Sequence, residues 1–266
     1  MLIKPDGAHA SIRSHYTVFS SLATTNNGTA VALCHSPTGL PDIAEFHLAT
    51  GANRIRRRGG SLGIDQAWFA EPESFDFASA GGRQSHALVY PPTGDHCSGT
   101  EGELPPLIVI GHGGPTAHAP PQLDLKINYW TSRGFCGCQC QLRRIERLRL
   151  PPTAISSKAR GIVDVEDCVA VARQLVAAGR VDLSRCAIRG SSAGGLTVLL
   201  ALATSDLFSA GTSLYGVAEL ATLATDTHKF EARYPTVSSG AIPKTRRSTP
   251  NARPSIMPAR SLLRCW

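Results

Sequence analysis

Short runs of alternating polar and apolar residues occupy the first part of the chain, residues 1 to about 65. Alternation with a period of two predicts β-strands, and Asn-Gly and Thr-Gly pairs between the runs predict turns. The strands are expected at His15–Ser20, Ala30–His35 and Ile43–Leu48. Because so few strands bury too little apolar surface to be stable alone, residues 1–65 are predicted to be a small β-subdomain or the remnant of a β-propeller, its last blade.

From about residue 66 to residue 234 the pattern changes to alternating strands and helices. Leu107–Ile110 is wholly apolar, which suits a strand buried on both faces of a parallel sheet. Further strands are expected at Glu73–Phe77, His86–Tyr90, Arg185–Arg189 and Gly211–Tyr215, and helices at Leu123–Ser132, Val163–Ala178, Ala193–Thr204 and Ala218–Ala224. This alternation predicts an α/β fold with a doubly wound, mostly parallel sheet.

Composition places the chain among globular proteins. It has 266 residues, of which 42% are hydrophobic, enough for a full core. No run approaches the roughly 18 to 20 apolar residues that a membrane span needs, and the first residues do not resemble a signal peptide. A soluble, cytoplasmic protein without membrane contacts is therefore expected, and its oligomeric state is left open.

The chain has a net charge of +7, and its excess of basic residues is concentrated in two segments. Residues 136–160 hold six basic residues against one acid, and residues 235–266 hold six against none. Three cysteines also fall in the first segment at one-residue spacing, Cys136, Cys138 and Cys140, which matches no common zinc motif. We expect neither a metal site, nor a cofactor, nor a nucleic-acid partner from these segments.

The sequence Gly190-Ser191-Ser192-Ala193-Gly194-Gly195 lies between an expected strand and an expected helix. A G-x-S-x-G sequence in this setting predicts a nucleophile elbow, a turn so tight that the positions beside the serine must be small. Ser192 is then the nucleophile, with Gly190 and Gly194 supporting the turn. The N–H of Ala193 would be one donor to an oxyanion, because free N–H groups and the positive end of the helix dipole lie there.

A second glycine-rich sequence, His112-Gly113-Gly114-Pro115, directly follows the apolar strand. By itself it could be an ordinary Gly-Pro turn. Together with the elbow it predicts the second oxyanion donor, assigned to the N–H of Gly114, with His112 and Gly113 ordering the loop.

Five stretches resemble the catalytic domain of the prolyl oligopeptidase family, closest to its acylaminoacyl-peptidase and dipeptidyl-peptidase-like members. They are PPLIVIGHGGPT, NYWTSRGF, GIVDVEDCVAVARQLV, DLSRCAIRGSSAGG and SLYGVAELATLATDTHKFEARY, within residues 66 to 234. The resemblance implies a serine peptidase that cuts short peptides, a β-propeller that screens substrates by size, and a Ser–Asp–His triad in that order along the chain.

Two segments depart from the family pattern, 136–160 and 235–266. In the first, the family has an apolar strand and a loop of the form AVVNVNYGGSSGYG, and one reading frame of the back-translated CGCQCQLRRIERLRL encodes that sequence. A second change of frame after Tyr234 is the matching hypothesis for the tail, residues 235–266, which is expected to be aberrant and disordered. The first change is expected to remove a central strand, since burying Arg and Gln without partners costs several kcal/mol.

The resemblance also places the Asp and His of the triad beyond residue 266, so the chain is expected to be truncated. Asp206, Asp226 and His228 are the only Asp and His residues after Ser192, and none matches a triad loop. Two alternatives to a peptidase stay open at this stage: an esterase or lipase on the same fold, and an inactive fragment.

Overall fold

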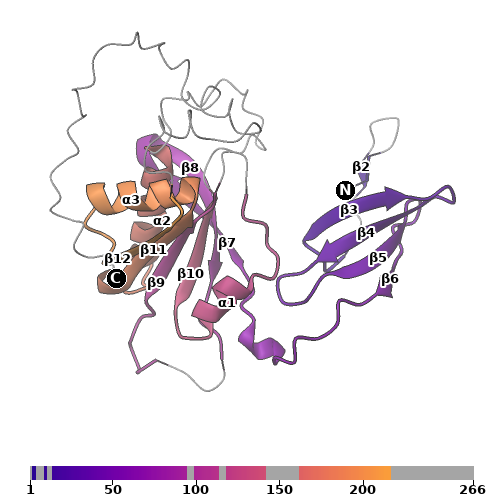
Figure 1. Ribbon diagram of the computed structural model, residues 1–266, viewed down its shortest axis with the longest axis horizontal. Coiled ribbons are helices and arrows are strands. Elements are labelled where there is room, and N and C mark those ends of the chain that lie inside the picture. Colours follow the sequence, from indigo (N-terminus) through magenta and orange to yellow (C-terminus); the bar gives the residue numbers. More distant parts are fainter. Residues whose placement is uncertain are drawn as a thin grey trace, which may run out of the picture. The chain divides into compact units, whose positions relative to one another are not determined.

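The computed structural model describes residues 2–3, 9–10, 14–94, 99–113, 118–141 and 162–216. The chain divides into two compact units. The first unit comprises Met1–Glu73, Tyr90–Ser98 and Pro120–Phe135, and the second comprises Ser74–Val89, Gly99–Ala119 and Cys136–Trp266. Each unit holds its own β-sheet (Figure 1).

The sheet of the first unit is an antiparallel meander in the order β3-β4-β5-β6. Its strands are β3 (Val18–Thr24), β4 (Thr29–His35), β5 (Asp42–His47) and β6 (Asn53–Arg57). A small core packs on one face, made of Tyr16, Ala32, Cys34, Ala44 and Phe46. The expected β-region is confirmed, with a fourth strand, β6, that the sequence pattern did not reveal because four of its five residues are Asn or Arg.

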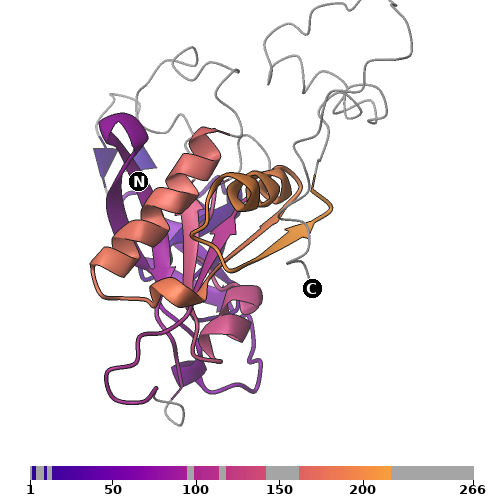
Figure 2. The same cartoon turned by 90° about the vertical axis from the view of Figure 1, so that its left-hand side faces the viewer.

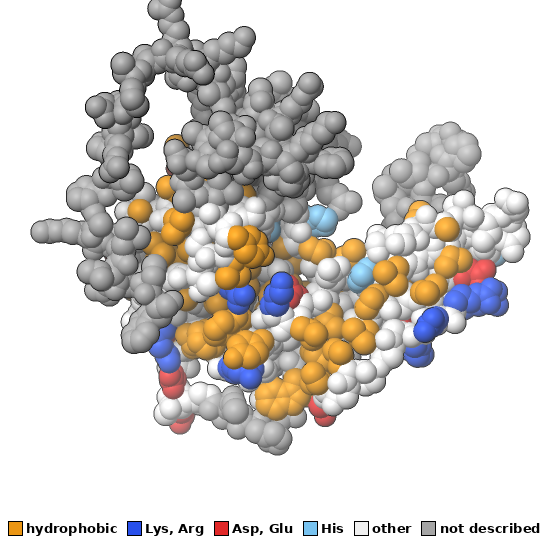
Figure 3. All heavy atoms as spheres, in the orientation of Figure 1, with side chains coloured by type: hydrophobic (Ala, Val, Ile, Leu, Met, Phe, Trp, Pro, Cys, Tyr) orange, Lys and Arg blue, Asp and Glu red, His pale blue; other side chains and the backbone are white. Residues whose placement is uncertain are grey.

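Polar contacts hold the edges of this sheet together. Glu45 accepts hydrogen bonds from the guanidinium groups of Arg54 and Arg56, which lower the pKa of its carboxyl to about 2. Basic side chains gather beside an acidic one over the β5–β6 hairpin (Figure 3). Tyr16 donates to Asp42 at 2.7 Å.

The first unit also contains two short helices. The helix α1 spans Leu125–Thr131, close to the predicted Leu123–Ser132. The 3₁₀-helix η1 spans Gln66–Trp68. Asp124 caps α1 by accepting from the N–H of Lys126 at 2.8 Å. The side chain of Asn128 accepts from the N–H of Ala70 at 2.8 Å, which joins α1 to the chain just before β7. Near the start of the chain, β1 (Leu2–Ile3) pairs with β2 (His9–Ala10).

The sheet of the second unit has six strands in the order β12-β11-β9-β10-β8-β7. Its strands are β7 (Glu73–Ser79), β8 (Arg83–Tyr90), β9 (Leu107–Gly111), β10 (Cys136–Gln141), β11 (Cys186–Ser191) and β12 (Ala210–Leu214). β9 lies in the middle, parallel to both β10 and β11, and β12 is parallel to β11. The predicted α/β fold with a mostly parallel sheet is therefore present.

Two helices cover one face of this sheet, as Figure 2 shows: α2 (Val163–Ala177) and α3 (Ala193–Thr204). Asp167 of α2 is fully buried, and it accepts hydrogen bonds from Ser79 and Ser85 of the sheet. Arg83 pairs with the neighbouring Glu166. These polar contacts fix the start of α2 against β7 and β8, because a buried carboxylate is stable only when it is hydrogen-bonded. The 3₁₀-helices η2 (Ala80–Gly82) and η4 (Leu183–Arg185) precede β8 and β11.

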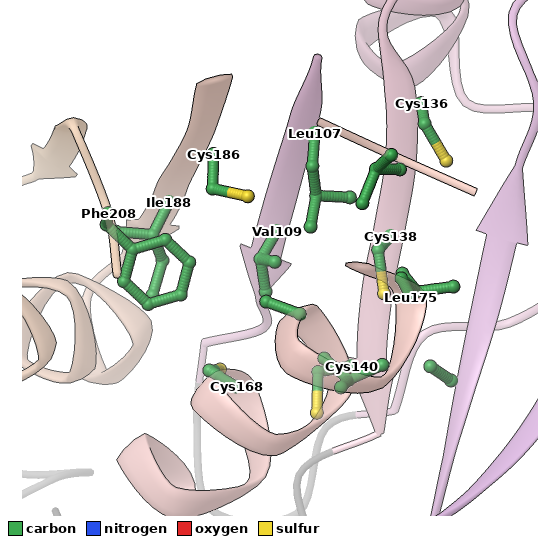
Figure 4. Packing of buried hydrophobic residues seen from close by; sticks show 14 of the residues in the cluster. Leu107, Val109, Cys136, Cys138, Cys140, Cys168, Leu175, Cys186, Ile188 and Phe208 are labelled. Atoms are coloured by element: carbon green, nitrogen blue, oxygen red, sulfur yellow. The ribbon is translucent and has the colours of Figure 1, made fainter. Parts of the chain in front are cut away.

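Strand β10 corrects the expectation that segment 136–160 lacks a central strand. Cys136, Cys138 and Cys140 are buried on β10 and pack in the same core as Leu107 and Val109 of β9 (Figure 4). Cysteine behaves as a small hydrophobe, so a strand that presents it at alternate positions can be buried. The polar Gln141 is accommodated because its amide exchanges hydrogen bonds with the backbone of Ala119.

The remaining residues of that segment, 142–160, lie outside the described residues, as do the expected helix at 218–224 and the tail at 235–266. Within the described parts, no helix is long and apolar enough to cross a membrane.

Candidate active site

Ser192 sits at a sharp turn between the end of β11 and the start of α3. Its backbone has φ 54° and ψ −118°, and Ser21 and Tyr215 are the other non-glycine residues with positive φ in the described ranges. Such a conformation costs on the order of 1–3 kcal/mol and persists only where surrounding contacts impose it. The predicted strand-turn-helix setting of Ser192 is thus present.

Glycines impose this turn because the backbone approaches itself too closely for any side chain. A Cβ on Gly190 would lie 2.3 Å from the carbonyl oxygen of Gly194, and a Cβ on Gly194 would lie 2.5 Å from that of Gly111. Gly195 has equally little space, with the Cα of Gly216 at 2.6 Å from an added Cβ. The small residues around Ser192 are therefore a steric requirement of the turn.

The loop after β9 lies beside Ser192. β9 and β11 are parallel neighbours, with Gly111 opposite Gly190, so both strands end at the same edge of the sheet. A Cβ on Gly113 would lie 3.7 Å from the Cβ of Ser192. His112 makes a hydrogen bond within this loop, from its Nδ1 to the carbonyl oxygen of Gly113 at 3.2 Å. Gly114, the predicted donor, lies outside the described residues.

The start of α3 gives the site its electrostatic character. Ala193 is the first residue of the helix, so its N–H has no acceptor within the helix. The N–H of Leu196 donates to the carbonyl oxygen of Ser192 at 3.2 Å, which closes the first turn of α3. The helix dipole and the free N–H favour negative charge beside Ser192, as an oxyanion requires.

A third segment reaches Ser192 that the sequence pattern did not single out. The N–H of Ser192 donates to the carbonyl oxygen of Leu214 at 3.0 Å, at the end of β12. The next residue, Tyr215, has φ 40° and is 81% exposed. A signal was present in the sequence, since Leu-Tyr-Gly stands at the carboxyl end of the expected strand Gly211–Tyr215, but only the parallel pairing of β11 and β12 places it beside the serine.

The acidic and histidine residues that could complete a triad do not meet Ser192 in the described residues. Asp206 precedes β12 and is exposed at the edge of the sheet opposite to Ser192. His86 and Asp76 form a hydrogen-bonded pair at 2.6 Å on β8 and β7, but two strands separate β8 from β11, which is roughly 14 Å at the usual strand spacing. Asp226 and His228 lie outside the described residues.

Cys138 and Cys186, two buried cysteines of the sheet, are neutral thiols. Burial raises the pKa of Cys138 well above its usual range and that of Cys186 to about 11. Neutral thiols are poor nucleophiles and poor metal ligands. Among the residues that the structure describes, no three His, Cys, Asp or Glu side chains are grouped so that they could hold a metal ion.

Known structures share this architecture. A crystal structure of puromycin hydrolase is 35% identical with a TM-score of 0.78, and the match covers 89% of this chain and 36% of that one. A puromycin-hydrolyzing peptidase of Mycobacterium tuberculosis is 33% identical with a TM-score of 0.80, covering 91% of this chain and 38% of that one. The Pyrococcus horikoshii acylaminoacyl peptidase, 21% identical with a TM-score of 0.73 over 91% of this chain and 38% of that one, shows the same fold.

The chain therefore spans a little over a third of the length of these relatives. A comparison with curated proteins gave no significant match. The sequence model of the prolyl oligopeptidase family matches residues 121–256, which include the turn at Ser192 and about half of the chain. With the fold, the glycine-constrained turn and this match in agreement, the chain belongs to the prolyl oligopeptidase family.

Proposed function

We propose that this chain carries the nucleophile and the oxyanion-binding groups of a serine peptidase that cuts short peptides. The observation that carries the proposal is the backbone of Ser192, held at φ 54° by contacts that exclude any side chain at Gly190 and Gly194. A fold stores such strain at sites where it must present a reactive group.

In the proposed reaction, the Oγ of Ser192 forms a bond to the carbonyl carbon of the scissile amide. The hydroxyl proton passes to a general base, which the family resemblance implies is a histidine oriented by an aspartate, both following Ser192 along the chain. The carbonyl oxygen becomes an oxyanion and accepts from the N–H groups of Ala193 and Gly114. Collapse expels the amine, which takes the proton from the base, and water then hydrolyses the acyl-enzyme ester.

Relatives support an amide rather than an ester as the substrate. A puromycin hydrolase and a puromycin-hydrolyzing peptidase of Mycobacterium tuberculosis, both more than 30% identical to this chain, are named for cleaving puromycin. We therefore propose aminoacyl amides and short peptides as substrates, a cytoplasmic location, and no requirement for a cofactor.

A fluorophosphonate probe tests the nucleophile, since it reacts with activated serines. The wild-type chain is expected to be labelled at Ser192, as located by peptide mass spectrometry. Ser192→Ala should abolish labelling, and Ser191→Ala, which removes the neighbouring hydroxyl on β11, should retain it. Equal labelling of the two variants would refute the assigned nucleophile, and a wild-type chain without labelling would be the inactive fragment, whose serine lacks its base.

Substrate hydrolysis then separates the reaction classes. Turnover of puromycin and of an aminoacyl anilide, with little turnover of a short-chain ester, is expected of a peptidase. Faster turnover of the ester would favour an esterase. A labelled chain that turns over neither substrate would be a fragment with an activated serine that cannot complete the reaction.

A further inference from the structure

We infer that Gln141 is a positioning residue for the oxyanion site, because its side-chain amide fixes the far end of the loop that follows β9. This inference rests on the proposed function, since the same loop carries the proposed donor Gly114. The near end of the loop lies against Ser192, and the far end lies at Ala119. Three observations support the role of Gln141: its place in the sheet, its two hydrogen bonds, and the contacts at the near end of the loop.

The strand order places Gln141 at the edge of the sheet where Ser192 lies. β9 lies between β10 and β11, and all three strands are parallel (Figure 1). Cys140, Gly111 and Gly190 form one row across these strands. Gln141 is the next residue of β10, level with the point where the chain leaves β9. The loop therefore begins between the turn at Ser192 on one side and Gln141 on the other.

Both hydrogen-bonding groups of the Gln141 amide contact a single residue. Its Nε2 donates to the carbonyl oxygen of Ala119, and its Oε1 accepts from the N–H of Ala119 at 3.1 Å. This pair of bonds resembles the exchange between two residues of neighbouring antiparallel strands. Ala119 is buried, so its backbone groups need partners within the protein, and the amide supplies one to each.

The near end of the loop is held by contacts with the turn at Ser192. A Cβ on Gly113 would lie 3.7 Å from the Cβ of Ser192 and 3.1 Å from the carbonyl oxygen of Ser191. Gly113 and Ala119 are only six residues apart in the sequence. Fixing both ends of so short a loop limits where an N–H between them can lie. An oxyanion donor stabilises charge most when it is held in place before the reaction.

Two substitutions at Gln141 separate the donor of the amide from its acceptor. Methionine has a similar length and neither group, so Gln141→Met removes both bonds to Ala119. Glutamate has the same shape and keeps the acceptor, so Gln141→Glu retains the bond from the N–H of Ala119 and loses the other. If Gln141→Met does not fold, Gln141→Glu provides the same comparison.

The matched control is Gln174→Met. Gln174 donates to the carbonyl oxygen of Ala78 at 2.6 Å, a bond of the same kind that joins α2 to the end of β7. Three strands separate β7 from β11 in the sheet, so this bond lies far from Ser192. The control therefore loses an amide-to-backbone bond without a change at the loop.

The first measurement is the second-order rate at which a fluorophosphonate labels Ser192 in the full chain, with urea unfolding to confirm that each variant folds. Gln141→Met should react about 10- to 100-fold more slowly than wild type, since a misplaced group costs up to that factor. Gln141→Glu should react about 3- to 10-fold more slowly, the effect of one lost hydrogen bond. A purely structural role of Gln141 would lower stability, as in Gln174→Met, and leave the rate unchanged.

The second measurement is amide hydrogen exchange of peptides that cover residues 107–122, which needs no reaction at Ser192. In Gln141→Met, exchange in these peptides should be about 10-fold faster than in wild type, because the loop opens more often once its far end is released. Gln174→Met should exchange at the wild-type rate there.

The outcomes separate this inference from the proposed function. Slower labelling and faster exchange in Gln141→Met, with neither in Gln174→Met, support the role of Gln141. Unchanged exchange in Gln141→Met, or labelling as fast as in Gln174→Met, overturns that role and leaves the nucleophile assigned. A wild-type chain without labelling bears on the proposed function alone, and the exchange rates then decide whether Gln141 holds the loop.

Discussion

The middle of the second sheet and the turn at its carboxyl edge differ in which residues they can accept. In the middle, β10 is built from cysteine, glycine and glutamine, whereas its neighbour β9 is built from leucine, isoleucine and valine, and both are buried in one core. At the edge, the residues around Ser192 leave no room for even one additional methyl group at Gly190, Gly194 or Gly195.

The difference arises because the contacts in the middle of the sheet are between side chains, whereas those at the turn are between backbone atoms. Side chains meet side chains in the middle of the sheet, and these can be exchanged for others of suitable polarity with modest repacking. At the turn, backbone meets backbone, and a backbone cannot repack without moving the strand or the helix that carries it. The sheet therefore requires only that its buried positions hold residues of suitable size and polarity. The turn at Ser192 requires glycine at particular positions.

The largest effect is expected from Gly194→Ala, because its Cβ would lie 2.5 Å from the carbonyl oxygen of Gly111. We expect a loss of about 3 kcal/mol or more in unfolding free energy. Probe labelling at Ser192 should fall about 100-fold, since small misplacements of a catalytic group cost that much. Urea denaturation and labelling rates measure the two effects.

The matched control is Gly111→Ala, the other partner of the same close approach. A Cβ there would meet Gly194 at 3.8 Å, an ordinary contact, so its stability should stay within about 1 kcal/mol of wild type. Equal losses in both variants would show that the crowding at the turn is not specific to Gly194.

A smaller effect is expected from truncating facing side chains in the middle of the sheet. Leu107 of β9 and Cys136 of β10 are register partners, and both are buried. Leu107→Ala should cost about 3 kcal/mol, and Cys136→Ala about 1 kcal/mol, because the thiol fills less volume than the isobutyl group. Denaturant midpoints at constant slope give both values, and a larger loss for Cys136 would contradict the view that β10 depends on pattern alone.

A further pair of variants measures the strain at Ser192. Both Ser192→Ala and Ser192→Gly remove the hydroxyl, but only glycine accommodates φ 54° and ψ −118° without strain. Ser192→Gly should therefore be more stable than Ser192→Ala by about 1 kcal/mol. The opposite order, which is normal at unstrained positions, would mean that the turn stores no strain.

The smallest effect concerns pH and the buried thiols. Burial raises the pKa of Cys186 from its usual value near 9 to about 11, and raises that of Cys138 in the same direction. The folded state therefore holds these protons more tightly than the unfolded state, so stability is complete below about pH 9 and is lost as the pH rises toward the folded pKa.

Denaturant midpoints between pH 8 and 10 measure this loss. Cys138→Ala and Cys186→Ala should each flatten the decline. The control Ile188→Val, on the same strand as Cys186 and without a titrating group, should leave its slope unchanged. An equal slope in all of these variants would assign the decline to other groups.

Local patterns predicted much of this fold. The expected helix Ala193–Thr204 has the bounds of α3, and the apolar run Leu107–Ile110 became β9 with one further residue. The sequence pattern does not predict strand β10, because its glutamines and the arginines that follow it are unfavourable in a buried strand. In the structure the cysteines are buried, and the amide of Gln141 is satisfied by the backbone of Ala119, a contact between residues 22 positions apart.

By itself, the sequence determined the order of strands and helices and the identity of the turn around Ser192, since periodicity and small residues act over a few neighbouring positions. Only the tertiary structure decided that Gly113 and Tyr215 flank the serine, because their placement depends on which strands pair. Parallel pairing joins segments that are tens of residues apart, and no local pattern specifies which strand ends will meet.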